Sequence, residues 1–155
     1  MRTFVTASVG TLLAVLASAA WAQSTLGQLL DNGAIKLTAE DFKQQVVGRI
    51  LEGPGRGVVP GPIASHEIVY LDGGLIRGAG QASVQGGATG GAATFSIEGT
   101  WAIDDQQRVC QSTRAGSVVL APRCHFWYRQ SGKFFFADSD TDRSAPLTLR
   151  SLKTM

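Results

Sequence analysis

Two runs of large alternating residues around a Ser131-Gly132 turn place the strongest constraint on the fold of this chain. The runs cover residues 123–130 and 133–137, and a Ser-Gly pair between such segments predicts a tight β-hairpin. Opposed residues of a hairpin project to the same side of the sheet. The expected register sets three pairs opposite each other: Arg129 and Phe134, Trp127 and Phe136, and His125 and Asp138.

Both faces of this hairpin carry aromatic rings. One face holds Phe126, Tyr128, Phe135 and Ala137, and the other holds His125, Trp127, Arg129, Phe134, Phe136 and Asp138. We therefore expect neither face to be fully bathed in water. Either one face packs in the sheet core while the other lies under a helix at 38–47, or one aromatic face lines a cavity for an apolar ligand. For the second case the candidate ligand-binding residues are Trp127, Tyr128, Phe134 and Phe136.

The remaining strands form a series of short segments separated by turn residues. Residues 66–71 predict a strand, 72–74 a turn, and Leu75 onward its return, while 95–103 and 108–112 form a hairpin around a DDQQ turn. A symmetric turn there sets Trp101 opposite Cys110, so we expect its ring to pack beside a disulfide. Residues 147–152 predict a last strand. The Gly/Pro-rich segment 53–62 predicts a loop or strap, and 78–93 is either a mobile loop or a pair of small-residue strands.

Two short helices precede the strands. Residues 24–32 place Leu26, Leu29 and Leu30 on one side of a turn or two. Residues 38–47 form the better specified helix, because Thr38 and Asp41 have the spacing of a capping box. The chain is therefore expected to be mainly β, with a short N-terminal helix packed on an antiparallel meander that curls into a small or partial barrel.

The first 22 residues have the pattern of a cleavable secretory signal peptide. Arg2 is followed by an apolar run and by the small-x-small sequence Ala20-Trp21-Ala22, so the mature chain is expected to be residues 23–155, one domain. The apolar run is shorter than the roughly 20 residues of a membrane-spanning helix. We therefore expect a periplasmic or secreted protein with no membrane span after cleavage.

Charge and cysteine content narrow the classes of partner. The chain has 14 Lys and Arg against 12 Asp and Glu, and loss of Arg2 leaves a net charge of +1. This balance argues against nucleic acid and against electrostatic binding to membranes. Cys110 and Cys124 are the only cysteines, and outside the cytoplasm two such thiols usually form a disulfide.

Motifs of known catalytic chemistry are absent from the sequence. HEIVY at 66–70 lacks the second histidine of a zinc-binding HExxH helix, and GGATGG at 86–91 lacks the lysine of a phosphate loop. Asp138, Asp140 and Asp142 have the spacing of the first ligands of a calcium-binding loop, but the glycine and glutamate that follow in such a loop are absent. The segment is therefore either an acidic turn or a weak calcium site. His125 and Asp138 form the one acid–base pair, without a nucleophile beside them. We therefore assign no catalytic residue, metal or cofactor.

Several short motifs occur in the order found in a group of small, signal-bearing proteobacterial proteins of uncharacterised function. They are Leu29-Leu-x-x-Gly33, Leu37-Thr-Ala-Glu-Asp-Phe42 closing at Gly48, Tyr70-Leu-Asp-Gly-Gly74, Gly99-Thr-Trp101, Cys110 and Cys124. The chain resembles this group from about Leu29 to Phe136, and the resemblance implies a periplasmic location and no known catalytic activity. The expected barrel is lipocalin-like in shape, but the lipocalin GxW motif lies on the first strand, so the lipocalin ligand site is not transferred.

The sequence favours a non-enzymatic periplasmic protein that binds either a protein surface or a small apolar molecule. We expect a monomer with an unknown partner. A carrier of a small apolar ligand is one alternative, and a small hydrolase that uses His125 or His66 is another.

Overall fold

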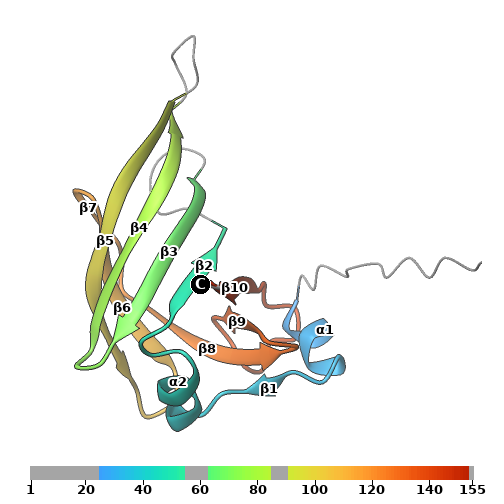
Figure 1. Ribbon diagram of the computed structural model, residues 1–155. Helices are drawn as coiled ribbons and strands as arrows, with labels where there is room; N and C mark the ends of the chain where they lie inside the picture. Colours follow the sequence, from blue (N-terminus) through green and yellow to red (C-terminus); the bar gives the residue numbers. More distant parts are fainter. Residues whose placement is uncertain (1–24, 55–62, 85–90, 154–155) are drawn as a thin grey trace, which may run out of the picture.

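A computed structural model describes residues 25–54, 63–84 and 91–153, and within them the protein is mainly β (Figure 1). The signal-like segment 1–22 and most of the Gly/Pro segment 53–62 lie outside the described residues. The described elements are α1 Leu26–Asp31, β1 Ile35–Lys36, α2 Ala39–Gln45, β2 Ile50–Gly53, β3 Ile63–Leu71, β4 Leu75–Val84, β5 Gly91–Ile103, β6 Val109–Ala115, β7 Val118–Val119, β8 Arg123–Gln130, β9 Lys133–Ala137 and β10 Thr148–Leu152.

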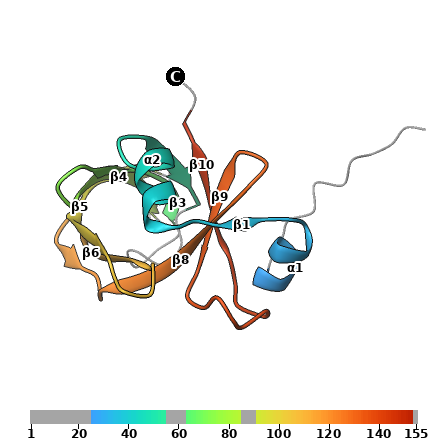
Figure 2. The same cartoon turned by 90° about the horizontal axis from the view of Figure 1, so that it is seen from below.

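Eight antiparallel strands close into a barrel, which confirms the expected fold class. Their order around the barrel is β2-β3-β4-β5-β6-β8-β9-β10, and β10 pairs back with β2. Figure 2, viewed from below Figure 1, shows β4, β5, β6 and β8 curving round this ring. The seam between β6 and β8 is short: it has three residue pairs, one of which is Cys110 with Cys124. β1 pairs with the later part of β8, at Arg129 and Tyr128.

The disulfide predicted from the two cysteines is present and joins the two strands of this seam. A disulfide between residues 14 apart stabilises the folded protein by about 3 kcal/mol on the chain-entropy model, because it restricts the unfolded chain. Trp101 faces inward, so the next residue, Ala102, faces outward. Cys110 lies opposite Ala102, and the disulfide is therefore on the outer side of the barrel.

The helix α2 packs across one end of the barrel (Figure 1). The predicted capping box is formed, because the Thr38 side chain accepts from the Asp41 N–H while the Asp41 carboxylate accepts from the Thr38 N–H. Phe42 is fully buried, with its ring centroid 5.3 Å from that of Tyr70 and 5.1 Å from that of Trp127. This aromatic cluster fills the α2 end of the lumen.

The second aromatic face of the β8–β9 hairpin is covered by α1, which corrects the expected placement of helix 38–47. Leu26 and Leu29 of α1 are completely buried against Phe126, Tyr128 and other residues of that outer face. The lumen face, with Trp127 and Phe134, packs with the residues of α2 instead. Both faces are therefore covered, each by a different helix.

The predicted register is confirmed in one hairpin and wrong by one residue in the other. β8 and β9 pair as expected, with Trp127 opposite Phe136 and Arg129 opposite Phe134. In the β5–β6 hairpin Trp101 lies opposite Gln111, and Ala102 takes the expected place opposite Cys110. The Trp101 ring accordingly packs in the lumen, and its Nε1 donates to the Leu71 carbonyl at 3.0 Å.

The uncertain segment 78–93 is resolved into paired strands where the structure describes it. β4 pairs with β5 from Leu75–Thr100 to Val84–Gly91. Glycine is required at Gly80, because a Cβ there would overlap the ring of Phe95 on the neighbouring strand. The small residues thus leave room for a large ring inside the barrel.

Candidate ligand-binding site

A cavity of about 320 Å³, which we call the mouth cavity, lies at the end of the lumen away from α2. Its volume is at the low end of the range of about 300–1,000 Å³ for small-molecule sites. Strands β3, β6, β8, β9 and β10 line it, and the lining residues include His66, Gln111, His125, Phe136, Asp138 and Arg150. It opens toward solvent beside Asp138 and Arg123, which are both exposed.

Three basic side chains are buried within the described part of the chain, and all three line the mouth cavity. His66, His125 and Arg150 are 5%, 4% and 7% exposed. Strand alternation directs them inward: His66 is two residues from the buried Ile68, His125 two from Trp127, and Arg150 lies opposite Phe134. Buried polar groups normally have hydrogen-bond partners, so their grouping on one cavity calls for a functional explanation.

Arg150 has incomplete hydrogen bonding. Its Nη1 donates to the Leu149 carbonyl at 3.0 Å and its guanidinium lies 4.9 Å from the centroid of the Phe136 ring. Its Nε is buried and has no acceptor, and it forms no ion pair within the described residues. All 12 Asp and Glu residues of the sequence fall inside the described ranges, so no side-chain carboxylate of this chain neutralises Arg150.

The surroundings of Arg150 and His66 determine their charges at neutral pH. Burial lowers the pKa of Arg150 to about 10, so the guanidinium is still protonated. Burial, followed by the positive charge of Arg150, lowers the pKa of His66 to about 4, so its ring is neutral. The His66 Nδ1 is also buried without a hydrogen-bond partner. Arg150 therefore contributes a positive charge to the cavity and His66 a neutral imidazole, and each has an unused polar atom.

The predicted pairing of His125 and Asp138 is formed at the rim of the cavity. Nδ1 of His125 and Oδ1 of Asp138 are 2.7 Å apart, with the His125 ring buried and the Asp138 side chain 76% exposed. Burial lowers the pKa of His125, and the hydrogen bond that its ring donates to the Asp138 carboxylate opposes this effect. The Asp138 carboxylate orients the His125 ring, which is neutral at neutral pH.

The four aromatic residues proposed as a ligand site are separated by the fold. Phe136 lines the mouth cavity, whereas Trp127 and Phe134 belong to the aromatic core at the α2 end. Tyr128 lies on the outer face under α1, where burial raises the pKa of its phenol to about 12. Sequence reasoning missed Arg150, because an arginine in a short last strand is normally a solvated residue.

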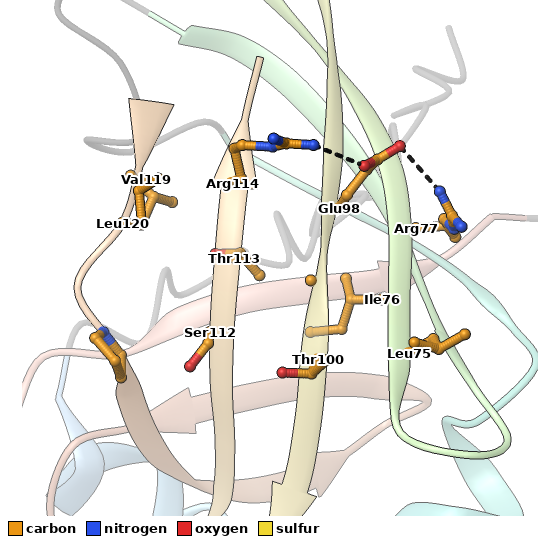
Figure 3. Close-up of a pocket in the computed structure, with 12 residues that line it drawn as sticks. Leu75, Ile76, Arg77, Glu98, Thr100, Ser112, Thr113, Arg114, Val119 and Leu120 are labelled. Atoms are coloured by element: carbon orange, nitrogen blue, oxygen red, sulfur yellow. Dashed lines mark hydrogen bonds and ion pairs between the residues drawn. The ribbon is translucent and has the colours of Figure 1, made fainter. Parts of the chain in front are cut away.

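A larger groove of about 580 Å³ lies on the outside of the barrel (Figure 3). Figure 3 shows Arg114, Glu98 and Arg77 in a row across β6, β5 and β4. Glu98 is 2.9 Å from Arg77 and 3.1 Å from Arg114, so both arginines are ion-paired with one shared carboxylate and the row keeps one net positive charge. The groove is open and its charged groups are paired, which makes it the weaker candidate for a specific ligand.

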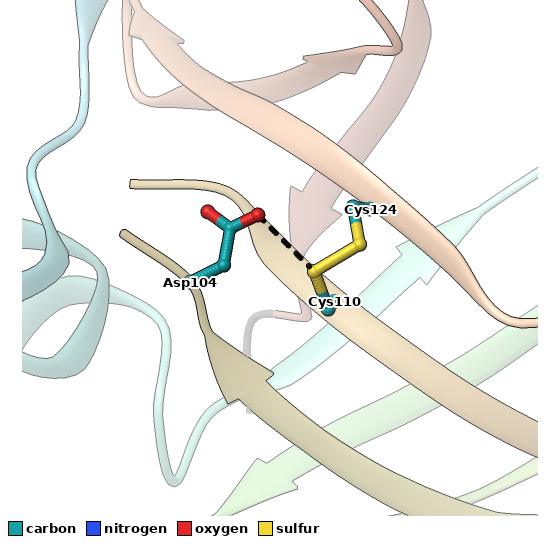
Figure 4. Close-up of side chains that lie close together, drawn as sticks. All are labelled: Asp104, Cys110 and Cys124. Atoms are coloured by element: carbon teal, nitrogen blue, oxygen red, sulfur yellow. Dashed lines mark hydrogen bonds between the residues drawn. A yellow bond between two sulfur atoms is a disulfide. The ribbon is translucent and has the colours of Figure 1, made fainter. Parts of the chain in front are cut away.

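In the described ranges, the aspartates at 138, 140 and 142 are not gathered into a group with close ligand atoms. The one group with close ligand atoms is Asp104 with Cys110 and Cys124, and Figure 4 shows the two sulfurs joined as a disulfide. Asp104 instead accepts hydrogen bonds from Arg108, whose backbone bond contributes most to the lowered pKa of Asp104. The calcium-loop candidates are used separately: Asp138 binds His125, Asp140 pairs with Lys36 at 2.6 Å, and Asp142 accepts from Ser144.

Among the described residues, neither helix has the length and apolar character needed to cross a bilayer. No family model matches the chain, and no match was found among curated protein sequences or solved structures. The geometry of the mouth cavity is therefore the observation that bears most directly on function.

Proposed function

We propose that this protein is a non-enzymatic binding protein that takes up a small molecule in the mouth cavity. The observation that carries the proposal is the grouping of the buried His66, His125 and Arg150 on one cavity that opens to solvent. Buried polar atoms without partners are unfavourable in the free protein, and a ligand that supplies their hydrogen bonds removes that penalty. A concave site with a few convergent polar groups is the usual form of a small-molecule site.

We further propose that the protein works outside the cytoplasm, in the periplasm or after secretion. The disulfide between Cys110 and Cys124 supports this location, because such bonds persist in oxidising compartments. The signal-like pattern of residues 1–22 is an independent argument from the sequence. The disulfide links β6 to β8, and it would stay oxidised in a compartment without cytoplasmic reductants.

A small hydrolase is the second candidate, favoured by the His125–Asp138 hydrogen bond at 2.7 Å. A carboxylate-oriented neutral histidine is a competent general base. Within the described residues, however, neither His125 nor His66 forms a hydrogen bond with a hydroxyl group that could act as nucleophile. Ester hydrolysis that is lost in the double variant His66→Ala/His125→Ala would favour this candidate over simple binding.

Blocking the cavity tests the binding function directly. Thr148 lines the mouth cavity opposite Phe136, and Thr148→Trp should fill part of the space. Thr100→Trp adds the same ring on the exposed outer face of β5 and serves as the matched control. We measure the binding of octanol and octanoate by ligand-observed NMR, and expect Thr148→Trp to weaken it at least fivefold while Thr100→Trp leaves it unchanged. No binding of either probe to the unmodified protein would refute the proposal.

A further inference from the structure

We propose that the mouth cavity recognises a small organic monoanion, a carboxylate with a compact apolar body, and that Arg150 holds the carboxylate. This inference rests on the proposed function and names its ligand class. Arg150 is 93% buried, lines the cavity and has a buried Nε without an acceptor. A buried charge without a counter-ion is energetically unfavourable, and binding of an anion beside it would remove that penalty.

No Asp or Glu side chain serves as a counter-ion for Arg150. Every Asp and Glu of the sequence lies in the described ranges, and none is within ion-pair distance of this guanidinium. The carboxylate that shares the cavity, Asp138, is hydrogen-bonded to His125 and exposed to water. Among the described residues, no negative charge compensates Arg150, and an anionic ligand would supply one.

The guanidinium is held in place by its surroundings. Nη1 donates to the Leu149 carbonyl, and the Phe136 ring lies 4.9 Å below the group. Gly53 leaves room for this arrangement, because a Cβ at that position would overlap Nη1 of Arg150 and push the guanidinium aside. The edge formed by Nε and Nη2 makes no hydrogen bond in the described structure. That edge is the one that pairs with both oxygens of a carboxylate.

Charge balance favours a monoanion. Arg123 and Asp138 stand at the rim with opposite charges, and Arg150 lies inside with one positive charge. His66 and His125 add hydrogen-bonding atoms without charge at neutral pH. One negative charge thus neutralises the site, whereas a dianion would leave a buried charge uncompensated.

The apolar part of the lining favours an organic ligand over an inorganic ion. Phe136, Leu120 and Leu147 line the same cavity as Arg150. A carboxylate at the guanidinium would place an attached alkyl or aromatic body among these side chains, where burial of apolar surface adds affinity. A free inorganic anion would gain the charge pairing alone.

The test compares octanoate with octanol by isothermal titration calorimetry. The two probes share an alkyl chain and differ in the charged headgroup, and we expect octanoate to bind roughly ten- to a hundredfold more tightly through its charge-assisted hydrogen bonds. Arg150→Met should lower octanoate affinity by a similar factor and leave octanol within threefold. Arg77→Met removes an exposed arginine from the outer face of the barrel and should change neither affinity.

Two further variants keep the test valid if Arg150→Met misfolds. Arg150→Lys retains the charge but loses the planar fork, and should give an intermediate loss of octanoate affinity. Gly53→Ala retains the arginine but displaces it, and should weaken octanoate at least fivefold with octanol unchanged. Equal binding of octanoate and octanol, both blocked by Thr148→Trp and insensitive to Arg150→Met, would overturn the anion inference while leaving the binding function intact. Failure of both probes would instead remove the binding function.

Discussion

Replacing Arg150 by methionine should make the ligand-free protein more stable. The reason is that the charged guanidinium is buried without a counter-ion, while methionine fills a similar space without charge. Lowering of the arginine pKa from 12.5 to about 10 corresponds to roughly 3 kcal/mol of electrostatic penalty at neutral pH, at 1.36 kcal/mol per pKa unit. This penalty is the part of the folding free energy that the substitution recovers.

Two favourable interactions of Arg150 are lost in the same substitution. The hydrogen bond to the Leu149 carbonyl contributes about 1 kcal/mol, and the contact with the Phe136 ring contributes about 0.5–1 kcal/mol. The remainder is a net stabilisation of about 1–2 kcal/mol. For a domain of this size that free energy corresponds to a rise in Tm of roughly 3–8 °C.

Differential scanning calorimetry measures this change on protein that has been unfolded and refolded, with its disulfide intact, to remove any bound molecule. Arg77→Met is the matched control, because it deletes an exposed arginine whose ion pair with Glu98 contributes little. A fall of more than about 5 °C for Arg150→Met, with the control unchanged, would show that the folded protein already compensates the charge. The argument for an anion site would then lose its physical basis.

Three further predictions concern the seam, the core and the pH dependence. Replacing both Cys110 and Cys124 by serine should destabilise the protein by about 3 kcal/mol in chemical unfolding, because the short seam loses its covalent link. Trp101→Ala should lower the free energy of unfolding by about 3–5 kcal/mol, because the ring packs in the lumen. The loss should be the same in the cysteine-free protein, and a much smaller loss there would contradict this placement of the ring. Because the pKa of His66 is lowered from 6.5 to about 4, protonation favours the unfolded chain: stability is complete above pH 6.5 and falls as the pH decreases toward 4. His66→Gln should flatten that decline in unfolding measured at each pH, and an unchanged profile would exclude the histidine as its cause.

The hairpin registers show what turn chemistry can specify from sequence. In the β8–β9 turn, Ser131 and Gly132 both have positive φ, 48° and 74°, as a two-residue turn of this kind requires. The register followed from the length of that turn. In the β5–β6 turn Gln107 adopts φ 63°, and the Asp104 N–H donates to the Arg108 carbonyl, so the loop has three residues instead of four. Nothing in the sequence marks Gln107 for a left-handed conformation, and the pairing of Trp101 was therefore wrong by one residue.

The candidate site was only partly predictable for a different reason. The pairing of His125 with Asp138 follows from local register, and the structure confirms it. Arg150 becomes a lumen residue only because β10 is enclosed between β9 and β2 when the barrel closes. In isolation its strand places Leu147 and Leu149 on one face and Arg150 on the other, which suggests an exposed arginine. Leu149 packs beside the α1 cluster on the outside of the barrel, and Leu147 contacts that cluster and also lines the mouth cavity.

The closed aromatic core and the buried basic side chains lie at opposite ends of this barrel. At the α2 end Phe42, Tyr70 and Trp127 form a closed aromatic core, and the helix that covers it is fixed by its capping box. At the mouth, His66 and Arg150 keep buried polar atoms without partners. A chain selected for stability alone would replace these residues with apolar ones, because a packed lumen end would be more favourable than an uncompensated charge. In the proposed binding function, the packed α2 end stabilises the fold and the polar groups at the mouth are kept for a ligand.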